Sequence, residues 1–217
     1  MYATRQTRQN INLALFDFDG TLCKRDSFTG FIFFALSKRH ILRQGLKILP
    51  WIQAYYLKLY PAHAMRPKLF AAMFKDTSAT ELEKLAQDYA ELLLDDLDPQ
   101  LLERLQQHQQ LGDRVVLVSA SVDVYLKPLC DALAIDLICS ATEVQNQRFT
   151  GNYLSADCSC AEKKRRVLQQ YRLEEFAQVY AYGNSHEDLE MLSLAQQCFM
   201  VGVDQQLPPL VNIKKLA

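Results

Sequence analysis

Two aspartates, Asp17 and Asp19, stand one residue apart directly after the apolar run Leu13–Phe16. Carboxylates this close repel each other unless a cation lies between them or one of them holds a proton. Because side chains alternate along an extended chain, both acids point to one side and Phe18 points to the other. An Asp-Gly turn at Gly20 would explain the end of this stretch alone. A carboxylate pair behind a buried strand indicates, in addition, a ligand site at the end of that strand.

Three later motifs place reactive side chains at the ends of predicted strands or at the start of a predicted helix. A Val-rich strand ends in a serine, a second strand ends in Gly-Asn-Ser, and a helix opens with two lysines. Parallel strands present their carboxyl ends at one edge of a sheet, so these motifs could share a site with the aspartates. The residues are Ser119, Ala120 and Ser121; Gly183, Asn184 and Asp188; and Lys163 and Lys164.

The surrounding pattern predicts an α/β fold. After residue 105 short apolar runs alternate with amphipathic helical spacing, which is typical of a parallel sheet covered by helices. The predicted strands are 13–16, 114–119, 135–139, 178–182 and 198–203, the helices are 122–133, 161–171 and 187–195, and 142–153 is a hairpin with Asn146 and Gln147 at its turn.

A helical segment separates the first strand from the second. We predict two or three helices over 27–75, and two more that begin at a capping box at Ser78 and at an Asp98-Pro99 N-cap. The expected fold is therefore a doubly wound, Rossmann-like parallel sheet with an inserted all-helical cap. Residues 1–22 and 106–217 would form the core, and 23–105 the cap.

The four motifs together resemble those of the haloacid dehalogenase (HAD) superfamily of phosphohydrolases, in the same order and over nearly the whole chain. The branch that it resembles carries a helical cap after the first motif and includes phosphoserine phosphatases. The resemblance implies a Mg²⁺-dependent phosphomonoester hydrolase that forms an aspartyl-phosphate at Asp17. The chemistry of the side chain supports this role for Asp17, because a carboxylate can attack phosphorus. Asp19 would protonate the leaving alkoxide and then deprotonate the attacking water.

The same resemblance assigns the other catalytic side chains. Ser119 would donate a hydrogen bond to a phosphoryl oxygen, and a lysine would supply positive charge to the same group. Spacing to Val167 and Leu168 favours Lys164 for this role, and Lys163 is the alternative.

Metal and substrate contacts are implied in the same way. Mg²⁺ would be held by the Asp17 carboxylate, the Asp19 backbone carbonyl and the side chain at 184, all of them oxygen ligands that this ion prefers. Asp188 is counted as a fourth residue of this metal site, where it would lie behind the others and orient the lysine or a metal-bound water. Substrate contacts are expected at Gly20, Thr21, Asp26 and Ala120.

The chain departs from the HAD pattern in two places. Asn184 replaces the usual Asp, and an amide oxygen lacks the charge that would strengthen Mg²⁺ binding. In the cap, Asp26 stands where phosphoserine phosphatases hold the substrate amine. Phe70, however, stands where they carry an arginine for the substrate carboxylate, and Arg66 lies only one helical turn upstream. Phosphoserine is therefore our second choice of substrate, behind a phosphomonoester with an apolar or lipid-derived leaving group.

The cap segment has an unusual charge distribution. Residues 27–75 contain eight Lys or Arg, many aromatic residues and no acid, whereas nine acids follow over 76–103. This composition suits a peripheral contact with an anionic membrane. A helical bundle whose basic half pairs with its acidic half is the alternative explanation.

Composition limits the remaining choices. A net charge of −1 over 217 residues gives no reason to expect a nucleic-acid partner. The six cysteines have no disulfide or zinc spacing, and the polar N-terminus has no signal-peptide pattern, so we expect a cytoplasmic protein. A catalytically weakened phosphate-binding or regulatory module is the alternative from another class, and Asn184 is its support.

Overall fold

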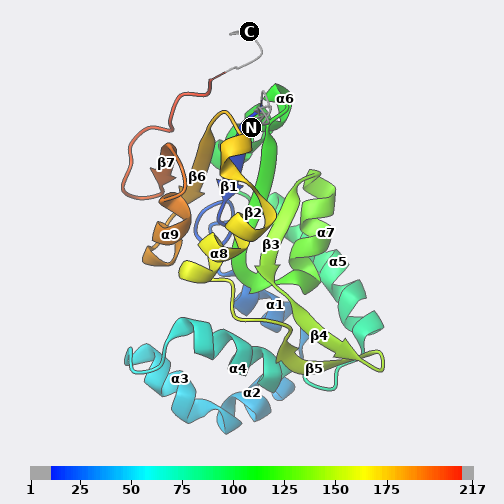
Figure 1. Ribbon diagram of the computed structural model, residues 1–217. Coiled ribbons are helices and arrows are strands. Elements are labelled where there is room, and N and C mark those ends of the chain that lie inside the picture. The colour runs from blue at the N-terminus through cyan, green and yellow to red at the C-terminus, as the bar shows by residue number, and fades with distance from the viewer. Residues whose placement is uncertain (1–10, 212–217) are drawn as a thin grey trace, which may run out of the picture.

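Five parallel strands form the central sheet of the structure, a computed structural model that describes residues 11–211 (Figure 1). Their order is β3-β2-β1-β6-β7, which confirms the doubly wound arrangement. At the centre, Phe16 of β1 lies in register with Leu117 of β2 and Tyr182 of β6. These positions of the three strands therefore lie side by side where the strands approach the cap. The strands are β1 (Leu13–Phe16), β2 (Arg114–Val122), β3 (Asp136–Ser140), β6 (Val179–Gly183) and β7 (Gln197–Met200).

Helices cover both faces of this sheet, which is why β1 is a continuous apolar run. Ala14 and Phe16 point into the larger apolar cluster, shared with α5 (Ala79–Asp95), α6 (Pro99–Leu111) and α7 (Asp123–Leu133). Leu13 and Leu15 point into a second cluster on the opposite face. That cluster is closed by two short helices, α8 (Ala161–Gln170) and α9 (Leu189–Leu192), and 3-10 turns lie at Leu173–Glu175 and His186–Asp188.

The all-helical insertion between β1 and β2 is also confirmed. Its first part contains four helices rather than two or three, because the chain is interrupted at Leu36, at Ile48 and between Leu57 and Pro61. Leu36 is extended, and the next residue, Ser37, caps the following helix with its side chain. The helices are α1 (Ser27–Ala35), α2 (Lys38–Lys47), α3 (Leu49–Tyr56) and α4 (Ala62–Phe74). In Figure 1, α2–α4 gather beyond the end of the sheet to which the arrowheads of β3 and β6 point.

The second part of the insertion returns the chain to the core. The Asp98 side chain accepts from the N–H groups of Gln100 and Leu101, and Gly112 ends α6 in the left-handed region with φ 77°. α5 packs along α7, so it touches the core more than α2 or α3 does (Figure 1). The division into a core of 1–22 and 106–217 and a cap of 23–105 stays a prediction.

The predicted hairpin is present and supports the cap. β4 (Thr142–Gln145) and β5 (Arg148–Tyr153) are joined by Asn146 and Gln147, both with positive φ, as a tight two-residue turn requires. Its backbone pairs with the α4–α5 connection, and Phe149 packs edge-on against Phe70 of α4. Phe70 is fully buried there.

A buried histidine joins α6 to the sheet. His108 has no exposed surface; its Nδ1 lies 2.8 Å from Oδ2 of Asp113, and its Nε2 lies 2.9 Å from the hydroxyl of Tyr182. A neutral imidazole meets both partners, donating from Nδ1 and accepting at Nε2. Burial lowers the pKa of His108 below its usual 6.5, although Asp113 acts in the opposite direction.

This lowered pKa predicts a pH-dependent stability. Below about pH 6.5 the unfolded chain takes up a proton at His108 that the folded chain resists, so stability rises as the pH is raised towards 6.5 and then levels. The difference in unfolding free energy between wild type and His108→Gln should follow this curve in urea titrations. His63→Gln, at an exposed position, is the matched control for the substitution itself. A flat difference for His108→Gln as well would contradict the assignment.

Candidate active site

The predicted motifs meet at the cap-facing end of the sheet. Asp17 follows β1, Ser119 lies in β2 where its pairing with β3 becomes irregular, and Asn184 follows β6. All three line one cavity of about 580 Å³ between the sheet and the cap. Asp19, Asp26, Ala120, Lys163 and Asp188 line it too.

A buried lysine lies between two carboxylates. Lys163 Nζ is 2.5 Å from Oδ1 of Asp17 and 2.5 Å from Oδ1 of Asp188. The lysine side chain is only 2% exposed and that of Asp188 only 1%. The Coulomb attraction between charges so shielded from water is much stronger than between charges at the surface. Removing any one of the three groups would therefore leave a buried charge without its partner.

The choice of Lys164 was wrong. That side chain points outward and bonds to Glu190 at 2.9 Å and to Ser193 at 3.2 Å, away from Asp17. The buried face of α8 is set by Lys163 and Val167, which are four residues apart and therefore on one side of the helix. Leu168, which favoured Lys164 in the sequence, is 48% exposed.

The electrostatics of this triad follow from burial and proximity. Burial raises the pKa of Asp17 to about 6, while the ammonium of Lys163 acts in the opposite direction. Burial alone would lower the pKa of Lys163, but Asp17 and Asp188 outweigh it and raise that pKa, so the lysine stays charged. The pKa of Asp188 is lowered despite burial, because Lys163 and two backbone N–H groups stabilise its anion.

Asp188 is oriented by donors on both oxygens. Oδ1 accepts from Lys163, and Oδ2 accepts from the backbone N–H groups of Asn184 and Ser185 and from the Ser185 hydroxyl, at 3.0–3.1 Å. This carboxylate therefore holds Lys163 in place, in agreement with an orienting role and not with direct metal ligation.

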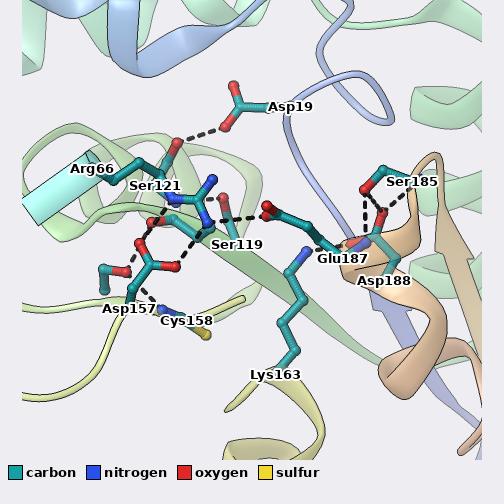
Figure 2. A network of polar contacts seen from close by, with 12 residues as sticks. Asp19, Arg66, Ser119, Ser121, Asp157, Cys158, Lys163, Ser185, Glu187 and Asp188 are labelled. Atoms are coloured by element: carbon teal, nitrogen blue, oxygen red, sulfur yellow. Dashed lines mark hydrogen bonds and ion pairs between the residues drawn. The ribbon is translucent and has the colours of Figure 1, made fainter. Parts of the chain in front are cut away.

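Asp19 is fixed by two serines. Its Oδ1 accepts from the N–H of Ser27 at 2.6 Å. Its Oδ2 accepts from the hydroxyl of Ser121 at 2.5 Å, as Figure 2 shows. Burial raises the pKa of Asp19, and these hydrogen bonds partly offset the rise. The sequence placed Ser121 in the second motif but gave it no role, although its two-residue spacing from Ser119 in a strand places both side chains on one side. Ser119 itself accepts from the Ser121 N–H at 3.1 Å.

The residues after Asp17 shape the site from behind. Thr21 is buried and donates its hydroxyl to Oδ2 of Asp17 at 2.8 Å, so it orients that acid. Gly20 has φ 81°, and a Cβ built there would lie 2.0 Å from Nδ2 of Asn184, so only glycine fits. Its N–H bonds to the Cys23 carbonyl. Neither Gly20 nor Thr21 is among the described residues that line the cavity, so their predicted substrate contacts find no support here.

Asp26 reaches the cavity from the start of α1. It is the N-cap of that helix, and its carboxylate accepts from the N–H and the hydroxyl of Thr29 at 3.0 and 2.7 Å. Asp26 is exposed, in contrast to the buried acids deeper in the cavity.

The oxygens expected to bind a cation are of three kinds: a carboxylate, a backbone carbonyl and a side-chain amide. Within residues 11–211, no group of three or more His, Cys, Asp or Glu side chains is arranged to hold a metal. The set expected for Mg²⁺ needs only one carboxylate, that of Asp17, with the Asp19 carbonyl and the Asn184 amide. Asn184 packs directly against Gly20, next to Asp19, which places these donors together. All are hard oxygen ligands, so the set fits Mg²⁺.

A second buried network was not predicted. Arg66 of α4 bonds to Asp157 and Glu187, which come from two different loops of the core (Figure 2). Glu187 was not among the predicted site residues, and its side chain is only 19% exposed. The feature of the sequence that could have identified Glu187 is its position within the fourth motif.

The outer wall of the cavity is apolar and belongs to the cap. Side chains from the helices α1, α2, α3 and α4 contribute to this wall. The opposite wall, on the side of the sheet, carries the charged residues described above. The apolar lining includes Phe28, Ile32, Ile41, Ile52, Met65, Leu69 and Met73.

Comparison with known proteins identifies this arrangement. The family model of haloacid dehalogenase-like hydrolases matches residues 14–193, from β1 to the end of the fourth motif. The chain belongs to the HAD-like hydrolases. It is an enzyme of the phosphatase type within them, and Mg²⁺ and a phosphate-ester substrate are implied by the family.

Individual relatives agree with this assignment. A histidinol-phosphatase of Neisseria meningitidis serogroup C (strain 8013) is 26% identical over 212 residues, covering 90% of this chain and 92% of its own. Protein CicA of Caulobacter vibrioides is 28% identical over 196 residues, covering 85% and 83%.

Solved structures share the fold. A protein of unknown function from Bordetella pertussis Tohama I superposes with a TM-score of 0.71 at 23% identity, covering 88% of this chain and 89% of that one. A phosphoserine phosphatase, solved as an analogue of its phospho-aspartyl intermediate, gives 0.60 at 17% identity and covers 88% and 87%.

The neighbouring lysines provide a matched pair of variants. Lys163→Gln removes the cation between Asp17 and Asp188 and should lower kcat by about 10²-fold or more, as for other buried donors at developing charge. Lys164→Gln removes an exposed ion pair and should leave kcat within about twofold of wild type. Steady-state kinetics on para-nitrophenyl phosphate, with circular dichroism as a folding check, measure both. Loss of activity in Lys164→Gln alone would show that Lys164, and not Lys163, acts on the phosphoryl group.

Proposed function

We propose that this HAD-like hydrolase cleaves phosphomonoesters through a phosphorylated Asp17. The observation that carries the proposal is the position of Asp17 at the inner end of the cavity, with Oδ1 held by Lys163 and Oδ2 held by Thr21. A carboxylate oxygen so fixed can attack phosphorus, and the bond from phosphorus to the ester oxygen breaks as the new bond forms.

Asp19 is the proposed acid and base. Its raised pKa suits a carboxyl that delivers a proton to the departing alkoxide. The resulting carboxylate then takes a proton from water as that water attacks the aspartyl-phosphate, which restores Asp17 and releases phosphate. Ser27 and Ser121 keep the group aimed during both steps.

Charge on the transferred group is met by Lys163 and Ser119, both of which line the cavity. Asp188 acts through Lys163. Mg²⁺, held by Asp17, the Asp19 carbonyl and Asn184, would neutralise charge where the phosphoryl oxygens meet Asp17.

Replacing the nucleophile tests this proposal. Asp17→Asn keeps the shape and the Thr21 contact, but an amide does not attack phosphorus, so turnover of para-nitrophenyl phosphate should fall by at least about 10³-fold. Wild type, and not the variant, should also bind BeF₃⁻, a phosphoryl mimic, in the presence of Mg²⁺. Turnover at the wild-type rate by the folded variant would show that Asp17 is not the nucleophile.

The cavity supports an apolar leaving group. Its outer wall is built from aliphatic and aromatic cap residues, and its one arginine, Arg66, is already paired with two carboxylates. Phe70 lies buried against the hairpin and offers no charge. A substrate carboxylate would therefore meet no unpaired cation among the described lining residues, which disfavours phosphoserine.

A cationic leaving group is the second candidate, and Asp26 favours it. This acid lines the cavity opening without an ion-pair partner in the part of the chain that the structure describes. The Neisseria relative is named a histidinol-phosphatase, and histidinol phosphate carries an amine and an imidazole.

One substitution separates the two candidates. Asp26→Asn keeps a good N-cap and removes the charge. It should reduce kcat/KM for histidinol phosphate by about tenfold if Asp26 binds the amine. It should leave kcat/KM unchanged for a phosphate ester with an uncharged alkyl leaving group, such as hexyl phosphate. Faster turnover of phosphoserine than of either ester would reject both candidates in favour of the soluble phosphoserine-type alternative.

The cap surface supports a peripheral contact with an anionic membrane. Leu42, Leu46 and Leu57 are each more than 60% exposed. The lysines and arginines of α2 and the residue Lys58 form no ion pair within the described residues, so the acidic half of the cap does not neutralise them. Within residues 11–211 no helix is both long and apolar enough to cross a bilayer.

Vesicle binding tests this contact. Each basic residue near an anionic surface contributes on the order of 1 kcal/mol. Wild type should co-sediment with phosphatidylglycerol vesicles at low salt, and Lys47→Glu with Lys58→Glu should abolish binding while the hydrolysis of para-nitrophenyl phosphate continues. Failure of wild type to sediment would reject the contact.

A further inference from the structure

Arg66 connects the cap to the core through three hydrogen bonds. Its Nε and Nη2 lie 2.8 Å from the two carboxylate oxygens of Asp157, and Nη2 also lies 3.0 Å from Oε2 of Glu187. In Figure 2 the arginine extends from the cap helix α4 between these acids. A guanidinium that binds one carboxylate through two nitrogens has a fixed orientation, which a lysine could not reproduce.

The two acids belong to the segments that carry Lys163 and Asp188. Asp157 precedes α8, whose first turn supplies Lys163, and Glu187 is the neighbour of Asp188 in the fourth motif. The loops are also joined directly, because the N–H of Cys160 donates to the Glu187 carbonyl at 3.0 Å. One arginine therefore contacts both segments on which the Lys163–Asp188 pair depends.

Burial makes these contacts consequential. The Asp157 side chain is 2% exposed and that of Arg66 is 21% exposed, so water screens the pair weakly. Among the basic residues of 27–75, Arg66 is the one that is ion-paired in the described structure. It is also the ionic link between α4 and the core.

We propose that Arg66 is a positioning residue: it clamps the cap over the site and, through Asp157 and Glu187, fixes the loops that hold Lys163 and Asp188. The effect on turnover rests on the proposed function, whereas the clamp itself does not. Because two carboxylates already occupy it, Arg66 does not serve as a receptor for a substrate anion.

Amide exchange reports the clamp without any need for activity. The N–H groups of Cys158 and Cys160, on one loop, and of Asn184 and Ser185, on the other, are all hydrogen-bonded within this region. In Arg66→Gln, hydrogen–deuterium exchange over 157–160 and 184–188 should become at least tenfold faster than in wild type, while β1 is unaffected. Arg43→Gln, an exposed arginine on α2, is the matched control and should leave both loops protected.

Kinetics on para-nitrophenyl phosphate complete the test. A positioning role predicts a kcat at least tenfold lower in Arg66→Gln with KM changed less than threefold, and only partial recovery in Arg66→Lys. Arg66→Gln leaves Asp157 buried without its partner and could unfold the chain. Glu187→Gln, which keeps the Asp157 pair, should then show the same effects at 184–188 in smaller degree.

Amide exchange tests the clamp, and kcat tests the positioning role. Faster loop exchange supports the clamp, and a lower kcat beside it supports positioning. Unchanged exchange in folded Arg66→Gln and Glu187→Gln would overturn the proposal, as would a lower affinity for substrate with normal loop protection. If wild type hydrolysed none of the esters, the exchange result alone would decide the clamp, and the proposed function would fail separately.

Discussion

A single ammonium between two buried carboxylates is the interaction on which the site depends. Lys163 bonds to Asp17 and Asp188 at the same time, and without its positive charge two buried acids would lie close together with no cation between them. Breaking a buried pair by removing one partner costs about 3–5 kcal/mol. The arrangement therefore requires that three elements, β1, α8 and the loop after β6, deliver their side chains to one point.

The fold meets this requirement through strand register and local donors. β1, β2 and β6 run level, so residues just beyond their ends are neighbours although they are far apart in sequence. Each acid is then fixed by a nearby group: Thr21 for Asp17, Ser121 for Asp19 and Ser185 for Asp188. Gly20 allows Asn184 to pack against the backbone beside Asp19. Much of the polar character of these loops thus serves to orient the acids.

Much of this could be predicted from the sequence because it is encoded locally. Apolar runs that end in Asp, Ser and Gly-Asn specify buried strands with polar ends, and Asp98-Pro99 with Gly112 specifies the bounds of α6. The lysine was misassigned for an equally local reason. Leu168 was taken as a buried position, although it lies on the solvent side of α8, and that error moved the predicted buried face by one residue.

Contacts between distant segments could not be predicted in this way. Arg66 is 91 residues from Asp157 and 121 residues from Glu187, and no periodicity links them. The break at Leu36 between α1 and α2 has no glycine or proline, so the number of cap helices was underestimated, whereas Pro50 marks the start of α3. Pairing of this kind depends on how the cap is placed over the core.

The phosphorylated residue itself gives the most direct test of the account. Wild type is mixed with a phosphomonoester, quenched within milliseconds and treated with borohydride, which reduces an aspartyl-phosphate to homoserine and leaves a free carboxylate unchanged. Mass spectrometry of the peptide that contains the first motif should show homoserine at position 17 and an intact Asp19. Homoserine at position 19, or complete turnover of the ester with no reduced aspartate at all, would contradict the central claim that Asp17 is the nucleophile.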